Sequence, residues 1–192
     1  MMAGHPNETS PLGLRNLPFT IHMGENDTPY NRNKVAKEWE IKLQELQNND
    51  NNGYPHHVQI HKGKGHRMEL LDTVAFSWMT DFQRNPFPKK IIWKQDDVTH
   101  SRFYWLKDDK PTVRSLIVAS IEGQTINIEN TTISNFTIML NDSLVDMDKS
   151  VSVKYLGEEV YNGIIPRSIR TIKESIREYG DPASIYSGEI LI

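Results

Sequence analysis

Two side chains in the first third of the sequence have the chemistry of an acid–base pair. Asp27 follows the turn Gly24-Glu25-Asn26, and His66 follows a loop that contains Gly63 and Gly65. A carboxylate that is hydrogen-bonded to one imidazole nitrogen fixes the tautomer of the ring. It also stabilises the positive charge that forms when the other nitrogen takes a proton from a serine. The two residue types therefore predict the acid and the base of a catalytic triad.

The segments around these residues can bring them together. Residues 17–23 form an apolar run that predicts a strand ending just before Asp27, and residues 57–61 predict a second strand before His66. Open α/β sheets place their chemistry at the carboxyl ends of the strands, so we expect the two side chains to meet at one sheet edge. Apolar residues at helical spacing predict a helix between the strands: Val35, Trp39, Leu43 and Leu46.

A second helix and a domain boundary follow His66. Apolar residues recur at helical spacing over residues 70–82, and Pro86 and Pro88 then exclude a continuing helix. We therefore expect two domains, over residues 1–85 and 86–192. The predicted fold class is α/β for the first domain and mainly β for the second.

Beyond the boundary the hydrophobic pattern changes to the period of strands. Short runs rich in branched and aromatic residues predict half-buried strands of a small antiparallel β-sandwich-like domain. One helix interrupts them. Ser168 can cap its start and Gly180 can end it. Its apolar residues are expected to line the buried side: Ile169, Ile172, Ile176 and Tyr179.

Two short motifs carry a family resemblance. Met23-Gly24-Glu25-Asn26-Asp27 and Gly63-Lys64-Gly65-His66 resemble the last two active-site loops of serine α/β-hydrolases, in the group of prolyl-oligopeptidase-like and polyhydroxybutyrate-depolymerase-like esterases. In that fold the triad follows the chain order nucleophile, acid, histidine. The resemblance covers about residues 1–85. It implies that Asp27 is the orienting acid, that His66 is the general base, and that the β-rich remainder is an appended domain.

The sequence departs from this family at the nucleophile. No serine here is flanked by glycines two positions before and two positions after it, so the nucleophile elbow is missing. We therefore expect a C-terminal fragment of a serine hydrolase whose serine lies upstream and which is inactive alone. The expected substrate is a small-molecule or polymeric carboxylic ester, or alternatively a peptide. His5, in the loop after a preceding strand, is a candidate substrate-binding residue.

Other functions have weaker support. The alternative to a hydrolase is a non-catalytic binding or interaction module built on the β domain. The histidines at 56, 57, 61 and 66 do not favour a metal site, because His57 and His61 would lie roughly 13 Å apart on a strand. With a net charge of −3, no cysteine and no long apolar run, we expect no nucleic acid, membrane or cofactor as a partner. No export signal is visible, so location stays open, with a secreted or periplasmic protein possible if a signal peptide lies upstream.

Overall fold

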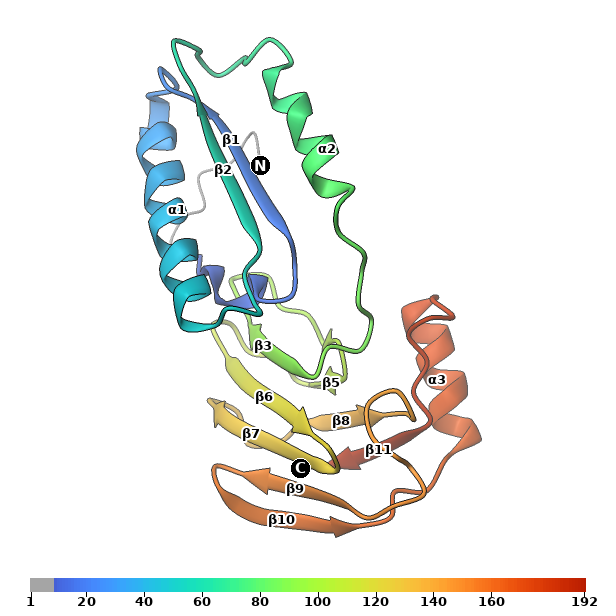
Figure 1. The fold of residues 1–192 in the computed structure, drawn as a ribbon. Coiled ribbons are helices and arrows are strands. Elements are labelled where there is room, and N and C mark those ends of the chain that lie inside the picture. Colours follow the sequence, from blue (N-terminus) through green and yellow to red (C-terminus); the bar gives the residue numbers. More distant parts are fainter. Residues whose placement is uncertain (1–8) are drawn as a thin grey trace. The chain divides into compact units, whose positions relative to one another are not determined.

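The structure, a computed structural model, describes residues 9–192 and is mixed α/β (Figure 1). Within the described residues it contains three sheets and three α-helices, and strands outnumber helices. The chain divides into two compact units. The first ends at Arg84 and the second runs from Asn85 to Ile192, next to the boundary expected from the prolines after residue 85.

The first unit is built on two parallel strands. β1 and β2 pair in register from Phe19 opposite His56 to Gly24 opposite His61, so their carboxyl ends are level. The elements of this unit are η1 (Pro11–Leu14), β1 (Phe19–Gly24), η2 (Pro29–Asn31), α1 (Arg32–Asn49), β2 (His56–His61), η3 (Leu71–Thr73) and α2 (Val74–Met79).

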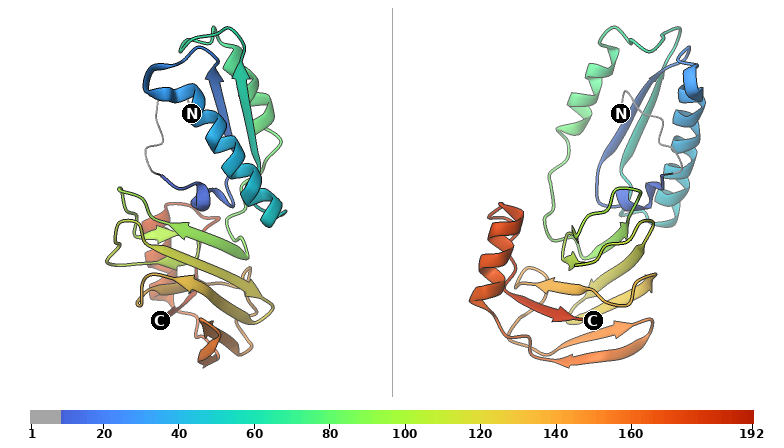
Figure 2. Two further views of the ribbon diagram at one scale, coloured as in Figure 1. Left: turned by 90° about the vertical axis from the view of Figure 1, so that its left-hand side faces the viewer. Right: turned by 180° about the vertical axis from the view of Figure 1, so that it is seen from behind.

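The two helices of the first unit lie on opposite faces of this strand pair (Figures 1 and 2). On one face, Trp39 of α1 contacts Phe19 with ring centroids 6.0 Å apart, and Leu43 is fully buried. On the other face, Trp78 of α2 contacts His57, also at 6.0 Å. Side chains alternate between the two faces of a strand, which explains why one pair of strands serves both helices.

The second predicted helix is shorter and less buried than its pattern suggested. α2 has six residues, preceded by the short 3₁₀ turn η3, and none of its side chains is fully buried. Leu70 and Phe76 are 76% and 70% exposed. Helical spacing identifies the residues that share a face, but the face is buried only where another element covers it.

The second unit holds two sheets. One has the order β10-β9-β7-β6-β3 and the other β11-β8-β5-β4. The elements are β3 (Lys90–Lys94), β4 (Arg102–Phe103), β5 (Leu106–Lys107), β6 (Leu116–Glu122), β7 (Thr125–Thr131), β8 (Thr137–Leu140), β9 (Val151–Tyr155), β10 (Glu158–Gly163), α3 (Ile169–Tyr179) and β11 (Gly188–Leu191).

Two details of this unit differ from the expectation. β7 and β9 pair in parallel, so the predicted antiparallel pattern is wrong for that pair. β5 and β10 were not predicted as strands. β10 lacks a buried side chain and forms by pairing with β9 across the turn at Leu156 and Gly157, both of which have positive φ. Backbone pairing, rather than an apolar pattern, therefore specifies this strand.

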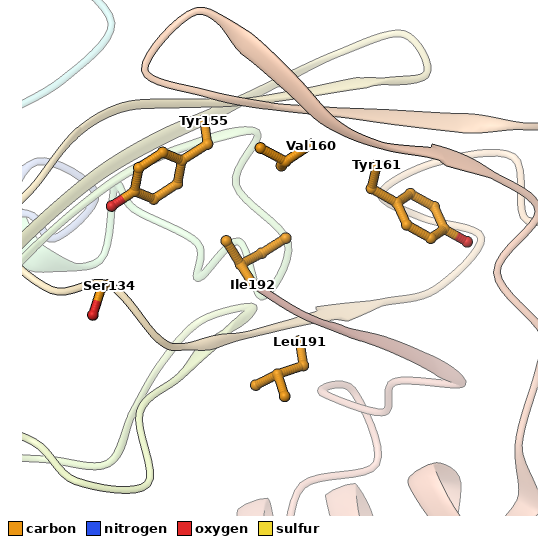
Figure 3. Close-up of a pocket in the computed structure, with 6 residues that line it drawn as sticks. All are labelled: Ser134, Tyr155, Val160, Tyr161, Leu191 and Ile192. Carbon is orange, nitrogen blue, oxygen red and sulfur yellow. The ribbon is translucent and has the colours of Figure 1, made fainter.

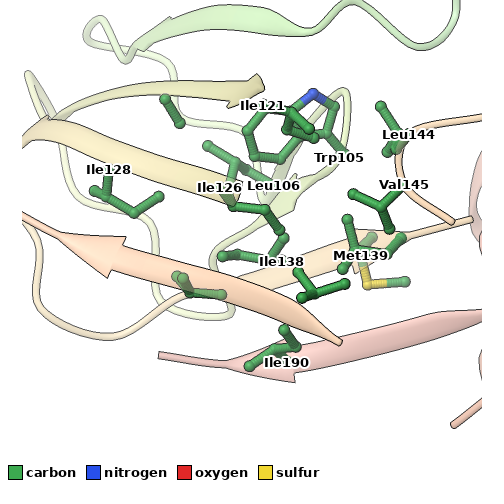
Figure 4. Packing of buried hydrophobic residues seen from close by; sticks show 14 of the residues in the cluster. Trp105, Leu106, Ile121, Ile126, Ile128, Ile138, Met139, Leu144, Val145 and Ile190 are labelled. Atoms are coloured by element: carbon green, nitrogen blue, oxygen red, sulfur yellow. The ribbon is translucent and has the colours of Figure 1, made fainter. Parts of the chain in front are cut away.

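The two sheets of the second unit share one apolar core (Figure 4). Trp105 and Ile126 are fully buried in it, and the indole nitrogen of Trp105 donates to the backbone oxygen of Pro88 at 2.8 Å. The side chains come from strands of both sheets and from the loop that carries Leu144 and Val145. Buried apolar area of this kind is the main favourable contribution to folding.

The predicted buried face of the third helix is right only in part, since Tyr179 packs against the core but Ile169 and Ile176 are exposed. Ser168 does cap α3 by accepting a hydrogen bond from the backbone N–H of Thr171, and Gly180 ends it with a positive φ. The fully buried side chains, however, are Thr171 and Ser175, whereas Ile169 is 73% exposed. The hydroxyl of Ser175 accepts from the backbone N–H of Tyr186 at 3.1 Å, an approach that a small polar residue allows.

Candidate acid–histidine site

The loops after β1 and β2 bring Asp27 and His66 into contact. Nδ1 of His66 lies 2.9 Å from Oδ2 of Asp27, within hydrogen-bond distance. The Asp27 side chain is 1% exposed, whereas that of His66 is 52% exposed. No described residue hydrogen-bonds the Nε2 atom of His66. The buried acid thus holds one side of the ring and leaves the other side open.

Backbone contacts fix the two loops against each other. The N–H groups of Glu25 and Asn26 donate to the carbonyls of His61 and Lys64, at 3.0 and 2.8 Å. In return, the N–H of Gly63 donates to the Glu25 carboxylate at 2.8 Å. These reciprocal bonds hold the acid loop and the histidine loop in one arrangement.

Gly24 permits this close approach. A Cβ atom at Gly24 would lie 2.1 Å from the carbonyl oxygen of Gly65 and 2.6 Å from that of Lys64. Any larger residue would therefore push the two loops apart. Gly65 itself has open space around the position of a Cβ, so the steric requirement rests on Gly24 alone of these two glycines.

Arg32 is the second partner of the acid. Its Nη2 atom lies 2.6 Å from Oδ1 of Asp27, and its Nε atom lies 3.0 and 3.1 Å from the two carboxylate oxygens. The hydrogen bonds from Arg32, and secondarily that from His66, hold the pKa of Asp27 below its ordinary value although burial acts in the opposite direction. Asp27 is therefore ionised at neutral pH, the state that can orient and stabilise an imidazolium.

A pair of histidines lies deeper in the same unit. Nδ1 of His22 and Nε2 of His61 are 3.1 Å apart, and both residues are buried. Within the described residues, the Nε2 atom of His22 is buried without a hydrogen-bond partner. Burial, followed by the neighbouring His61 and His57, lowers the pKa of His22. His22 is therefore kept neutral at physiological pH.

The remaining candidates from the sequence have different outcomes. His5 lies outside the described residues. Among those described, no group of three or more His, Asp or Glu side chains is arranged to hold a metal ion. In the same range no helix has the length and apolar character needed to cross a membrane.

Sequence reasoning missed the roles of two residues of the site, although it had noted Gly24 as part of the turn before Asp27. Arg32 could have been noticed, because a cation at the first residue of a helix is unfavourable beside the helix dipole and suggests a local acid. Gly24 had no comparable signal, since the space it leaves is needed only once the two loops meet.

A separate hollow lies in the second unit, between the β9–β10 hairpin and the end of the chain. Its volume is about 430 Å³, which is within the range of small-molecule sites. Tyr155 and Val160 face Ile192 across it (Figure 3). The full lining is Ser134, Tyr155, Val160, Tyr161, Leu191 and Ile192.

No protein-family model, no curated protein and no solved structure matches this chain.

Proposed function

We propose that the first unit supplies the acid and the histidine of a serine hydrolase, in which a serine outside this sequence attacks a carboxylic ester. The single observation that supports this proposal most is the 2.9 Å contact between a buried aspartate and a half-exposed histidine. A turn-forming aspartate and a surface histidine without a shared role would not need to meet at the ends of two parallel strands.

The roles follow from the geometry of the pair. His66 would take the proton of the serine at Nε2, the nitrogen to which no described residue is hydrogen-bonded. It would then give that proton to the leaving alcohol. Asp27 would keep the proton of the ring on Nδ1 and stabilise the imidazolium without accepting the proton itself. The exposure of the ring fits a group that meets its serine and substrate from another part of the protein.

The proposal extends to the fold. β1, α1 and β2 would be the last two strands of an α/β-hydrolase sheet with their connecting helix, and α2 would be its final helix. The parallel pairing and the level carboxyl ends of β1 and β2 support this assignment. Parallel sheets are normally covered on both faces. The exposed apolar side chains of η3 and α2 fit a surface that the rest of such a sheet would cover. The second unit would be an accessory domain.

The test needs the longer protein, with an upstream strand that leads into a Gly-x-Ser-x-Gly segment. A fluorophosphonate probe should label that serine, and the protein should hydrolyse p-nitrophenyl esters. We expect His66→Ala to lower kcat by about 10⁶-fold and Asp27→Asn by about 10⁴-fold, because the amide favours the wrong tautomer of the ring.

Matched controls separate chemistry from folding. His100→Ala and Asp109→Asn change the same residue types at exposed positions of the second unit and should leave turnover unchanged. Full turnover in the His66→Ala protein would refute the proposal. So would the absence of any probe-reactive serine in the longer protein.

The hollow in the second unit supports a second candidate function, that of a binding module. Its lining is mainly apolar and includes two tyrosines, a composition common in small-molecule sites. Under this alternative, Val160→Glu would abolish ligand binding, and Asp27→Asn would have no effect on any activity of the protein. A large loss of function in both Asp27→Asn and His66→Ala would exclude it.

A further inference from the structure

The side chain of Arg32 contacts both oxygens of the Asp27 carboxylate. Oδ1 accepts bonds from Nη2 and Nε of Arg32, whereas Oδ2 accepts from His66 and makes the longer contact to Nε. A carboxylate held by a single histidine could rotate about the Cβ–Cγ bond of the aspartate. The planar fork of a guanidinium restricts that rotation, because it fixes the plane of the carboxylate as well as the distance between nitrogen and oxygen atoms.

The position of Arg32 carries an energetic cost. It is the first residue of α1, where the helix dipole disfavours a cation. The two preceding residues, Tyr30 and Asn31, have φ values of 56° and 55°, which are uncommon for residues other than glycine. The Asp27 contact offsets this cost. The Tyr30 ring centroid also lies 5.7 Å from the guanidinium carbon, within the range of a cation–π contact.

Burial makes the arginine necessary for the acid. The Asp27 side chain is 1% exposed and that of Arg32 is 15% exposed, so water reaches neither group freely. A buried carboxylate without a matched cation would take up a proton instead of staying charged. A guanidinium keeps its positive charge at every pH at which proteins fold, so Arg32 supplies a permanent cation beside this carboxylate.

We propose that Arg32 is a positioning residue: its guanidinium fork fixes the plane of the Asp27 carboxylate so that Oδ2 points at Nδ1 of His66. The relevance of this arrangement to ester hydrolysis rests on the proposed function, whereas the positioning of Asp27 by Arg32 does not depend on it. The charged and titratable groups that face the carboxylate are Arg32 from α1 and His66 from the loop after β2.

The proposal can be tested on the present chain by NMR, without substrate. The variants are Arg32→Lys and Arg32→Gln, with Lys34→Gln as the matched control, because Lys34 is an exposed cation on the same helix turn. Two signals are followed: the carboxyl carbon of Asp27 during a pH titration, and the low-field proton on Nδ1 of His66. Dispersed backbone amide signals verify that each variant is folded.

The proposal predicts that the two Arg32 variants distinguish the effect of the positive charge from the effect of the planar fork. Lysine supplies charge without a planar fork, so Arg32→Lys should keep the pKa of Asp27 low while the Nδ1 proton signal broadens through exchange with water. Arg32→Gln should raise the pKa of Asp27 and also lose the Nδ1 signal. Lys34→Gln should match the parent chain in both measurements.

Other outcomes would overturn the positioning role. A sharp Nδ1 signal in Arg32→Lys would mean that charge alone suffices. Unchanged signals in Arg32→Gln would mean that Arg32 does not act on the pair at all. If Arg32→Gln fails to fold, the Arg32→Lys result decides. None of these measurements depends on turnover, so failure here leaves the hydrolase proposal standing, and an inactive longer protein leaves the role of Arg32 standing.

Discussion

The two units of this chain differ in how completely they enclose their apolar side chains. In the second unit, apolar side chains from two sheets enclose one another, and Trp105 and Ile138 are fully buried. In the first unit, buried positions include the charged or polar side chains Asp27, His22 and His61. The apolar residues of η3 and α2 in that unit remain largely exposed.

This contrast shows that one kind of burial provides stability and another fixes the geometry of a site. Apolar burial is non-directional and proportional to area, so the second unit can obtain its stability from its own core. Buried hydrogen-bonded groups contribute less net free energy, but they accept only narrow distances and angles. The first unit therefore specifies the position of the Asp27–His66 pair while leaving much of its apolar surface uncovered.

The largest effect should come from paired tryptophan substitutions, one in each unit. We expect Trp105→Ala to destabilise the second unit by about 3–5 kcal/mol, because it leaves a large cavity in a closed core. Trp78→Ala should cost about 1 kcal/mol, because this side chain lies on the short helix α2 without full burial. Urea unfolding followed by amide signals of each unit measures both values. Equal losses would remove the contrast between the two interiors.

A smaller effect is expected from the glycine at the loop contact. Gly24→Ala should cost about 1–3 kcal/mol, as overpacked sites do, and should break the Asp27–His66 bond, because the new Cβ meets two backbone carbonyls. Gly65→Ala is the control, since its Cβ would meet open space. Thermal unfolding and the His66 Nδ1 proton signal report the two consequences. A stable Gly24→Ala chain that keeps this signal would contradict the close loop approach.

The smallest effect is a pH dependence of the stability of the first unit. Burial lowers the pKa of His22 below its ordinary value of 6.5, so between these two values the unfolded chain binds a proton that the native state does not. Stability should therefore fall as pH decreases from 6.5, by at most about 1.4 kcal/mol per pH unit for one proton. The Asp27 contribution has a different range, since it is complete above 3.8 and is lost as pH falls through the lowered native pKa.

Hydrogen exchange of the β1 and β2 amides at several pH values measures this slope. His22→Gln can still hydrogen-bond to His61 but does not titrate, so it should flatten the slope just below pH 6.5 without changing the Asp27 response below pH 3.8. An unchanged slope in His22→Gln would assign the effect to another group.

The sequence was most informative where local signals were strong. The apolar runs and their glycine turns predicted β1 and β2, and the order of elements placed Asp27 and His66 at the same edge, where the structure has them in contact. Helix caps were equally readable, since Ser168 acts through its own hydroxyl and Gly180 through its own backbone conformation. Such signals depend on residues near one another in the chain, and tertiary context changes them little.

Tertiary structure decided the features that depend on contacts with residues distant in the sequence. Periodicity grouped Ile169, Ile172 and Ile176 on one face of α3, but a close approach to the Tyr186 backbone selected the Thr171 and Ser175 face for burial. In the same way, the sequence determined that an aspartate follows β1. Only the folded chain determined that Arg32 binds it, because a hydrogen bond requires two groups at fixed distance and angle, and spacing along the chain does not specify either.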